Sequence, residues 1–273
     1  MHPQGGPPAK ISLPGVKYIV AVASGKGGVG KSTVATNLAL ALQMLGQKVG
    51  LLDADIYGPS IPTMMGVPGV IDQATTPLPL DRYGMKLLSM GFFIPQEKAV
   101  IWRGPMIDRY LTQFIGGIDW GELDYLVIDL PPGTGDAQLT LTQKVELSGA
   151  IIVTTPQDIS LIDARKGLQM FREMRVPVLG IVENMSYFVG DDGKRYEIFR
   201  HGGGKKLATE AGTQFLGEIP IDPRVAECGD QGDPIVHRHP DSPIAHSYLS
   251  LAKAVMDGLQ HGEAPPPLPG LNF

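Results

Sequence analysis

The sequence predicts an α/β fold in which a doubly wound, mostly parallel β-sheet is flanked by helices. Apolar runs of strand length recur along the chain, and segments with helical spacing of apolar residues separate them. A glycine-rich loop stands directly between the first apolar run and the first helical segment. Regular alternation of strands and helices is typical of a sheet built from βαβ units.

Six apolar runs are expected to form the strands. Each is short and continuously apolar, which indicates a strand that is buried on both faces. The runs occupy residues 18–23, 49–53, 125–129, 150–154, 178–182 and 215–219, and a further short strand is expected at 87–90.

Four segments are expected to be helices, at residues 32–45, 106–115, 160–174 and 243–259. In the first, Val34, Leu38 and Leu42 recur at helical spacing, and Gly46 ends the helix.

No internal repeat or linker divides the chain, so we expect a single domain over residues 15–260. A flexible Gly- and Pro-rich lead-in at 1–14 precedes it, and a Pro-rich tail at 261–273 follows it.

The composition favours a soluble cytoplasmic protein. Of 273 residues, 43% are hydrophobic, and 23 basic against 28 acidic side chains give a net charge of −5, which argues against general binding of nucleic acid. The single cysteine, Cys228, excludes an intrachain disulfide. No signal peptide is recognisable, and no apolar run approaches the ~20 residues that span a bilayer.

Residues 25–32 read GKGGVGKS, the G-x-x-x-x-G-K-[ST] pattern of a phosphate-binding loop. Backbone N–H groups of such a loop wrap the phosphates, and the following helix N-terminus favours negative charge. The loop therefore predicts a site for ATP and Mg²⁺, in which Lys31 reaches the β- and γ-phosphates and Ser32 is a ligand of Mg²⁺. The expected nucleotide-binding residues here are Gly25, Lys26, Gly27, Gly28, Val29, Gly30, Lys31, Ser32 and Thr33.

Two strands end in acidic residues that suit phosphate chemistry. Asp53 is expected to hold Mg²⁺ through water, and Asp55 to orient the attacking water, with two solvated loop acids as the alternative. Asp129, which ends an apolar run, is the expected outer ligand of Mg²⁺.

The segment after Asp129 forms a rigid turn. Gly133 is placed to approach the γ-phosphate, whereas Asp136 could instead be the N-cap of the next helix.

Lys26 makes the loop resemble the deviant Walker A loop of the MinD/ParA/nitrogenase-iron-protein class, whose P-loop NTPase fold is SIMIBI-like. In that class a lysine at this position reaches the nucleotide of the facing subunit. The resemblance implies a homodimer in which Lys26 and Lys31 both act in catalysis, with slow ATP hydrolysis. Without it, Lys26 reads as a solvated loop lysine.

Five segments resemble the Mrp/ApbC branch of this class, the iron–sulfur cluster carrier ATPases. They read VASGKGGVGKST at 22–33, DADIYGPS at 53–60, DLPPGTGD at 129–136, VENMS at 182–186 and IPIDP at 219–223. The resemblance implies transfer of a cluster to apo-proteins, with these clients or an assembly scaffold as partners.

The same resemblance implies that Asn184, Pro220 and Asp222 hold the adenine. An Asn amide suits a base edge because it both donates and accepts. From the sequence alone, Asn184 could also be a turn residue after a strand.

The chain departs from this family where cluster carriers usually have a Cys-x-x-Cys pair. Gly190 and Gly193 replace the two cysteines, and the Asp-Asp-Gly between them predicts a hairpin turn. The ligands of any [4Fe–4S] cluster are therefore unknown. Cys228 is interpreted as a structural thiol. His201, His237, His239 and His246 could form a metal site, and His237 with His239 has a spacing that such a site allows.

Two alternatives to cluster transfer follow from the same loop. One is a nucleotide-gated positioning protein like MinD or ParA. The sequence shows neither a basic amphipathic C-terminal helix for membranes nor a basic surface for DNA. The other is an ATP-dependent dimer that docks an assembly protein.

Overall fold

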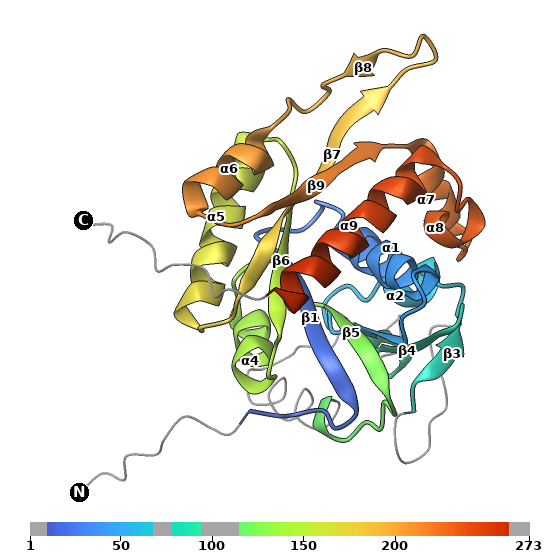
Figure 1. Cartoon of the computed structure of the whole chain (residues 1–273), viewed down its shortest axis with the longest axis vertical. Coiled ribbons are helices and arrows are strands. Elements are labelled where there is room, and N and C mark those ends of the chain that lie inside the picture. The colour runs from blue at the N-terminus through green and yellow to red at the C-terminus, as the bar shows by residue number, and fades with distance from the viewer. Residues whose placement is uncertain (1–9, 68–77, 94–114, 262–273) are drawn as a thin grey trace, which may run out of the picture.

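The computed structural model describes residues 10–67, 78–93 and 115–261, and Figure 1 shows their arrangement. Within these residues a single sheet separates two layers of helices. None of the described helices is both long and apolar enough to cross a bilayer.

The sheet contains nine strands among the described residues. They are β1 (Val16–Ser24), β2 (Val49–Asp53), β3 (Leu80–Arg82), β4 (Met85–Ser89), β5 (Leu123–Asp129), β6 (Gly149–Thr154), β7 (Val178–Val189), β8 (Arg195–Tyr196) and β9 (Phe215–Ile221). Their order is β3-β4-β2-β5-β1-β6-β7-β8, and β9 pairs with β7. Only the pairs β3–β4 and β7–β8 are antiparallel. The doubly wound, mostly parallel sheet is thus confirmed.

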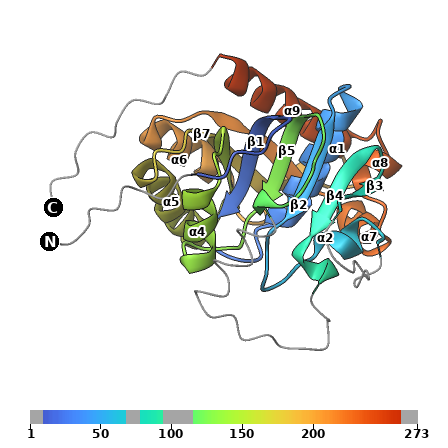
Figure 2. The same ribbon diagram turned by 90° about the horizontal axis from the view of Figure 1, so that it is seen from below.

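The described helices are α1 (Lys31–Met44), α2 (Ile61–Met64), α4 (Asp136–Lys144), α5 (Asp158–Glu173), α6 (Gly203–Ala211), α7 (Pro223–Asp230), α8 (Ile235–Arg238) and α9 (Pro243–Gln260), with a 3₁₀ turn at Met90–Phe92. In Figures 1 and 2, α1 and α9 lie together on one side of the sheet, and α4, α5 and α6 lie on the other. The central strands are buried on both faces for this reason.

The expected strands and three of the four expected helices appear within two or three residues of their predicted bounds, except that β7 is longer. The helix expected at 106–115 lies outside the described residues apart from its last residue. β7 continues seven residues beyond the predicted end at 182, so the interpretation of Asn184 as a turn residue after a strand is wrong.

A hairpin extends β7 beyond the body of the sheet, as Figure 1 shows. Its turn is the predicted one: the N–H of Gly190 donates to the carbonyl of Lys194 (3.0 Å), and Gly193 has a φ of +73°. A left-handed residue at this point is what a tight turn requires and glycine supplies.

Candidate nucleotide-binding site

The loop at residues 25–30 connects β1 to α1 at the carboxyl ends of the parallel strands. Gly25 lies against the main chain of α5, where an added Cβ would stand 2.1 Å from the carbonyl group of Asp163. The Ser24 hydroxyl donates to the Lys26 carbonyl (2.8 Å) and tightens the turn. Only glycine permits so close an approach at position 25.

The other side of the loop is open. A Cβ added at Gly27 or at Gly28 would meet nothing within 4 Å. Gly28 and Gly30 have φ values of +79° and +81°, which lets the chain curl ahead of the α1 N-terminus. An exposed, curled backbone before a helix N-terminus fits an anionic phosphate.

Lys31 is buried at the centre of the site, with 6% of its surface exposed. Its ammonium group donates to Oδ1 of Asp129 (2.7 Å) and lies 3.6 Å from Oδ2 of Asp55. The Ser32 hydroxyl donates to the other oxygen of Asp129 (2.6 Å). One lysine, one hydroxyl and two carboxylates, predicted from three separate motifs, are therefore in contact.

Asp53 and Asp129 pair in register on the neighbouring strands β2 and β5. Asp53 is fully buried and accepts hydrogen bonds from the Ser89 hydroxyl (2.9 Å) and the N–H of Asp55 (3.1 Å). Burial, with the charge of Asp129 adding to it, raises the pKa of the Asp53 carboxyl to about 8. Burial also raises the pKa of Asp129, against the opposing effects of Lys31 and Ser32. A divalent cation would relieve this clustering of acids, so the donor set fits Mg²⁺.

Asp55 is 7% exposed and faces Lys31. Its Oδ1 accepts from the N–H groups of Tyr57 and Gly58, both at 3.3 Å, which fixes the carboxylate. The reading of Asp53 and Asp55 as solvated loop acids is thus wrong, since both are buried.

Gly133 and Asp136 lie in the turn that follows β5. The N–H of Gly133 donates to the Ser24 carbonyl (2.9 Å), and its φ is +85°, so the turn rests on the phosphate loop. Asp136 is the first residue of α4, whose N-cap is Gly135, so the N-cap reading of Asp136 is wrong.

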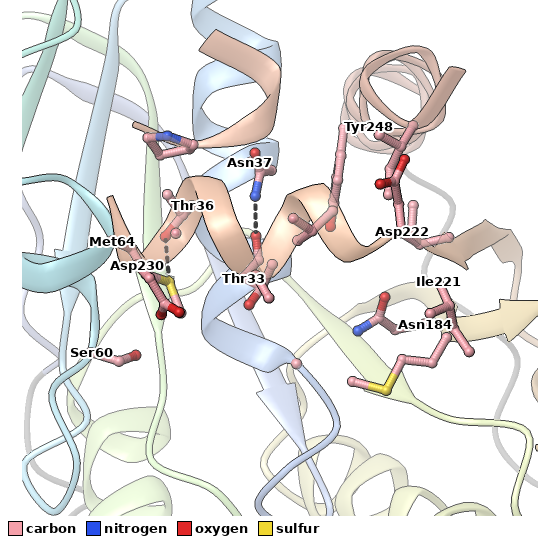
Figure 3. A pocket seen from close by; sticks show the side chains of 18 of the residues that line it. Thr33, Thr36, Asn37, Ser60, Met64, Asn184, Ile221, Asp222, Asp230 and Tyr248 are labelled. Carbon is pink, nitrogen blue, oxygen red and sulfur yellow. Dashed lines mark hydrogen bonds between the residues drawn. The ribbon is translucent and has the colours of Figure 1, made fainter. Parts of the chain in front are cut away.

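A cavity of about 770 Å³ opens beside the loop, between α1 and α7 (Figure 3). Asn184 from β7, Ile221 from the end of β9 and Asp222, the N-cap of α7, lie on one side, and Ser60 and Met64 lie on the other. Thr33 and Pro220 also line it. Its size suits a nucleoside, and it adjoins the phosphate loop at Gly30.

Two of the predicted base-binding residues have partners in the protein. The Asn184 amide donates to the Val29 carbonyl (2.8 Å). Asp222 is the N-cap of α7, and its carboxylate pairs with the Arg224 guanidinium (2.6 Å). This pair holds the pKa of Asp222 below its usual value.

Lys26 is half-buried at the rim of the loop. Among the described residues, no carboxylate oxygen lies within 4 Å of its ammonium group. The Ser24 hydroxyl holds its backbone, while within the described part of the chain its side chain has no anionic partner.

The structure does not bring the remaining metal candidates together. Cys228 is buried on α7 (2% exposed), as a structural thiol would be. Nδ1 of His237 contacts Asp233 (2.6 Å), and in the described part of the chain no third ligand joins His237 and His239. No cysteine stands in the hairpin, where Gly190 and Gly193 lie.

Sequence reasoning missed Ser89, which bonds to the buried Asp53. The available signal was a polar residue at the end of the apolar run at 87–90. It also missed Glu183, whose buried carboxylate accepts from the N–H of Gly204 (2.5 Å) at the start of α6. Nothing in the local sequence relates those two residues, which are 21 positions apart.

A phosphate loop in a doubly wound sheet, with a buried lysine between two strand-end carboxylates, defines the chain as a P-loop NTPase. Residues 15–256 match the family model described as ParA: NUBPL iron-transfer P-loop NTPase, and the chain belongs to that family.

Relatives and solved structures agree with this assignment. The iron-sulfur cluster carrier protein of Aquifex aeolicus is 56% identical over 248 residues, which are 89% of this chain and 68% of that protein. The iron-sulfur protein required for NADH dehydrogenase of Arabidopsis thaliana is 46% identical over 94% of this chain and 83% of its own length. A nucleotide-binding protein from Archaeoglobus fulgidus in complex with ADP is 40% identical, with a TM-score of 0.72 over 84% of this chain and 90% of that one. MinD of Pyrococcus horikoshii shares the fold at 22% identity, with a TM-score of 0.67 over 90% of this chain and 98% of that one.

Proposed function

We propose that this protein binds and slowly hydrolyses ATP as a homodimer and uses that cycle to deliver iron–sulfur clusters to apo-proteins. The observation that carries the ATPase half is the buried contact of Lys31 with Asp129 and Asp55 beneath an open glycine cradle. The proposal that the protein delivers iron–sulfur clusters rests on the names of the family members.

Each polar group at the site has a role in hydrolysis. Lys31 would leave its carboxylates to contact the phosphates, where its charge offsets the charge that develops in the transition state. Asp55, fixed by two backbone N–H groups, would accept a hydrogen bond from the attacking water. Mg²⁺, held by Ser32 and Asp129 with Asp53 behind them, would neutralise phosphate charge.

Asn184, Pro220 and Asp222 would hold the adenine in the cavity beside Thr33. A base in that cavity would lie next to the loop that would bind its phosphates.

The dimer is supported by Lys26 and by an apolar surface beside the phosphate loop. Lys26 has no anionic partner among the described residues of its own subunit, which suits a role toward a facing nucleotide. Large exposed apolar side chains gather on the α5 N-terminus and on the hairpin: Ile159, Ile162, Val189, Tyr196 and Ile198. An ion pair between Arg200 and Asp158 joins these two segments. Burial of such a surface would favour association.

Mixing two inactive variants tests both hydrolysis and the cross-subunit role of Lys26. A subunit with Lys26→Ala keeps its own Lys31, and a partner with Lys31→Ala keeps Lys26. Mixed dimers then hold one complete site, so an equal mixture should regain about a quarter of wild-type turnover, because random pairing makes half of the dimers mixed.

The matched control mixes Lys31→Ala with Asp55→Ala. Both residues act within one subunit, so no mixed dimer has a complete site and no activity should return. Equal turnover in the two mixtures would reject the role of Lys26 across the interface.

Cluster delivery is tested separately, by anaerobic incubation with a loaded scaffold protein and an apo-protein client. Transfer should be faster with ATP than without it, and slower with Lys31→Ala. If the client gains no cluster under any condition, the proposed cargo is wrong even where the ATPase half stands.

A further inference from the structure

Three side chains that the nucleotide site does not use converge at the base of the hairpin. They are Glu183 on β7, His201 in the loop before α6, and Glu218 on β9. One ligand atom from each lies within 4.8 Å of the others. Glu183 and Glu218 pair in register on neighbouring parallel strands, so the backbone itself sets the two carboxylates side by side.

Glu183 forms the buried wall of this group and is fully removed from solvent. Its Oε1 accepts from the Ser186 hydroxyl (2.6 Å) and from the N–H of Gly202 (3.0 Å), while Oε2 accepts, among the described residues, only from the N–H of Gly204 (2.5 Å). A carboxylate oxygen has two acceptor positions, so Oε2 retains one. The hydrogen bonds orient the carboxylate in the way that ligating carboxylates are held in metal sites.

His201 presents its two ring nitrogens to different carboxylates. Nε2 lies 2.9 Å from Oε1 of Glu218, and Nδ1 lies 3.8 Å from Oε1 of Glu197. Metal-bound histidines commonly place one nitrogen on the ion and donate the other N–H to a carboxylate. Glu197 lies on the Nδ1 side of the ring, at a distance that allows an ion pair but is too long for a hydrogen bond.

Arg195 balances the charge of the group. Its guanidinium lies 3.1 Å from Oε2 of Glu218, and it stacks on the ring of Tyr187, 3.5 Å from the ring centre. The cation competes with any metal ion for Glu218 and opposes it electrostatically.

We propose that Glu183, His201 and Glu218 bind one divalent first-row transition-metal ion, of the iron, cobalt and zinc class. An imidazole with two carboxylates suits these ions, whereas Mg²⁺ and Ca²⁺ prefer sets made of oxygen alone. Two anionic ligands match the charge of the ion, and the half-exposed rim at His201 and Glu218 leaves room for water ligands. The proposed metal site uses no thiol and no residue of the phosphate loop. Metal binding can therefore be tested separately from ATP binding.

Cobalt(II) is the probe, because its visible absorption reports nitrogen and oxygen coordination. The full-length protein is titrated without nucleotide or Mg²⁺, and bound cobalt is counted by equilibrium dialysis. We expect one tightly bound ion per chain. His201→Ala and Glu218→Gln should each weaken binding by about tenfold or more. His237→Ala is the matched control, since its imidazole also contacts an acid but has no third ligand among the described residues, and it should change nothing.

Arg195→Ala should change the cobalt affinity in the opposite direction. A purely structural role for Glu183, His201 and Glu218 would not produce such a change. Removing the competing cation should tighten cobalt binding, whereas weaker binding would overturn the proposed arrangement. ADP affinity of each variant verifies that the fold persists. Unaltered cobalt binding in His201→Ala, an equal loss in His237→Ala, or no tight site in the wild-type protein would each overturn the proposal.

Discussion

The side-chain amide of Asn184 donates a 2.8 Å hydrogen bond to the main-chain carbonyl of Val29, inside the phosphate loop. Asn184 is 5% exposed, and its nitrogen would stand 2.2 Å from a Cβ added at Gly30. The residue therefore positions the loop and lines the cavity at the same time.

Two substitutions at Asn184 should separate these effects. Asn184→Ala leaves a buried carbonyl without its donor, which costs about 1–3 kcal/mol, or about 5- to 150-fold in ADP affinity if the cost falls on the bound state. Asn184→Asp should be worse, because a carboxylate oxygen would then face the Val29 carbonyl. Isothermal titration with ADP measures both. Equal affinities of the two variants would mean that the contact with Val29 does not matter for binding.

Gly25 and Gly27 belong to the same loop but should respond differently to alanine. In Gly25→Ala the new Cβ would stand 2.1 Å from the Asp163 carbonyl, so the loop must move away from α5. We expect lower thermal stability and loss of nucleotide binding.

Gly27→Ala is the matched control, because nothing lies within 4 Å of its added Cβ. Its melting temperature should equal that of the wild type, and any loss of ADP affinity would then report a phosphate lying against the loop. If Gly25→Ala has the melting temperature and the ADP affinity of the wild type, then α5 can move away from the loop without loss of stability, and the prediction is wrong.

The sequence alone was enough to predict those parts of the site that depend on a local motif or on the end of a strand. The loop at 25–32 and the acids that end β2 and β5 follow from motif and strand position, because parallel strands bring their carboxyl ends to one edge. The contact of Asp129 with Lys31, 98 positions away, follows from that same geometry.

The sequence was insufficient where tertiary contacts override local signals. Met185, at a φ of +54°, forms an irregularity that lets β7 continue to Val189 after Asn184. No local pattern predicts a strained methionine inside a strand. The helix α7 was missed although Asp222 and Pro223 are N-cap and N1 signals, because we assigned that turn to adenine binding.

Cys228 should be a slow nucleophile in the folded protein. It is 2% exposed, and burial raises the pKa of its thiol, so the reactive thiolate is scarcer at pH 8 than in an unfolded chain. The alkylation rate of the folded protein should therefore begin to rise at a higher pH than the alkylation rate of the unfolded chain. Iodoacetamide labelling followed by mass spectrometry, with and without urea, measures this. Equal labelling rates in the two conditions would contradict the structural reading of the thiol.

A double variant in the hairpin tests whether the absence of the cysteine pair prevents this protein from holding a cluster there. In the double variant Gly190→Cys/Gly193→Cys, a Cβ at 190 would stand 2.9 Å from the ring of Tyr196, a side chain at the exposed hairpin surface that has room to move. A side chain at 193 must adopt a left-handed backbone, at a cost of about 1–2 kcal/mol. The variant should thus fold with a modest loss of stability.

Two thiols per subunit give four at a dimer interface, the number that holds a [4Fe–4S] cluster. After anaerobic reconstitution, the double variant should bind iron and sulfide in equal amounts and become a dimer by light scattering. Gly190→Cys alone supplies only two thiols per dimer and should bind no such cluster, which controls for adventitious iron. If wild type and double variant bind the same iron and sulfide, the hairpin is not where clusters are held, and the cargo must be bound through other residues or through the client itself.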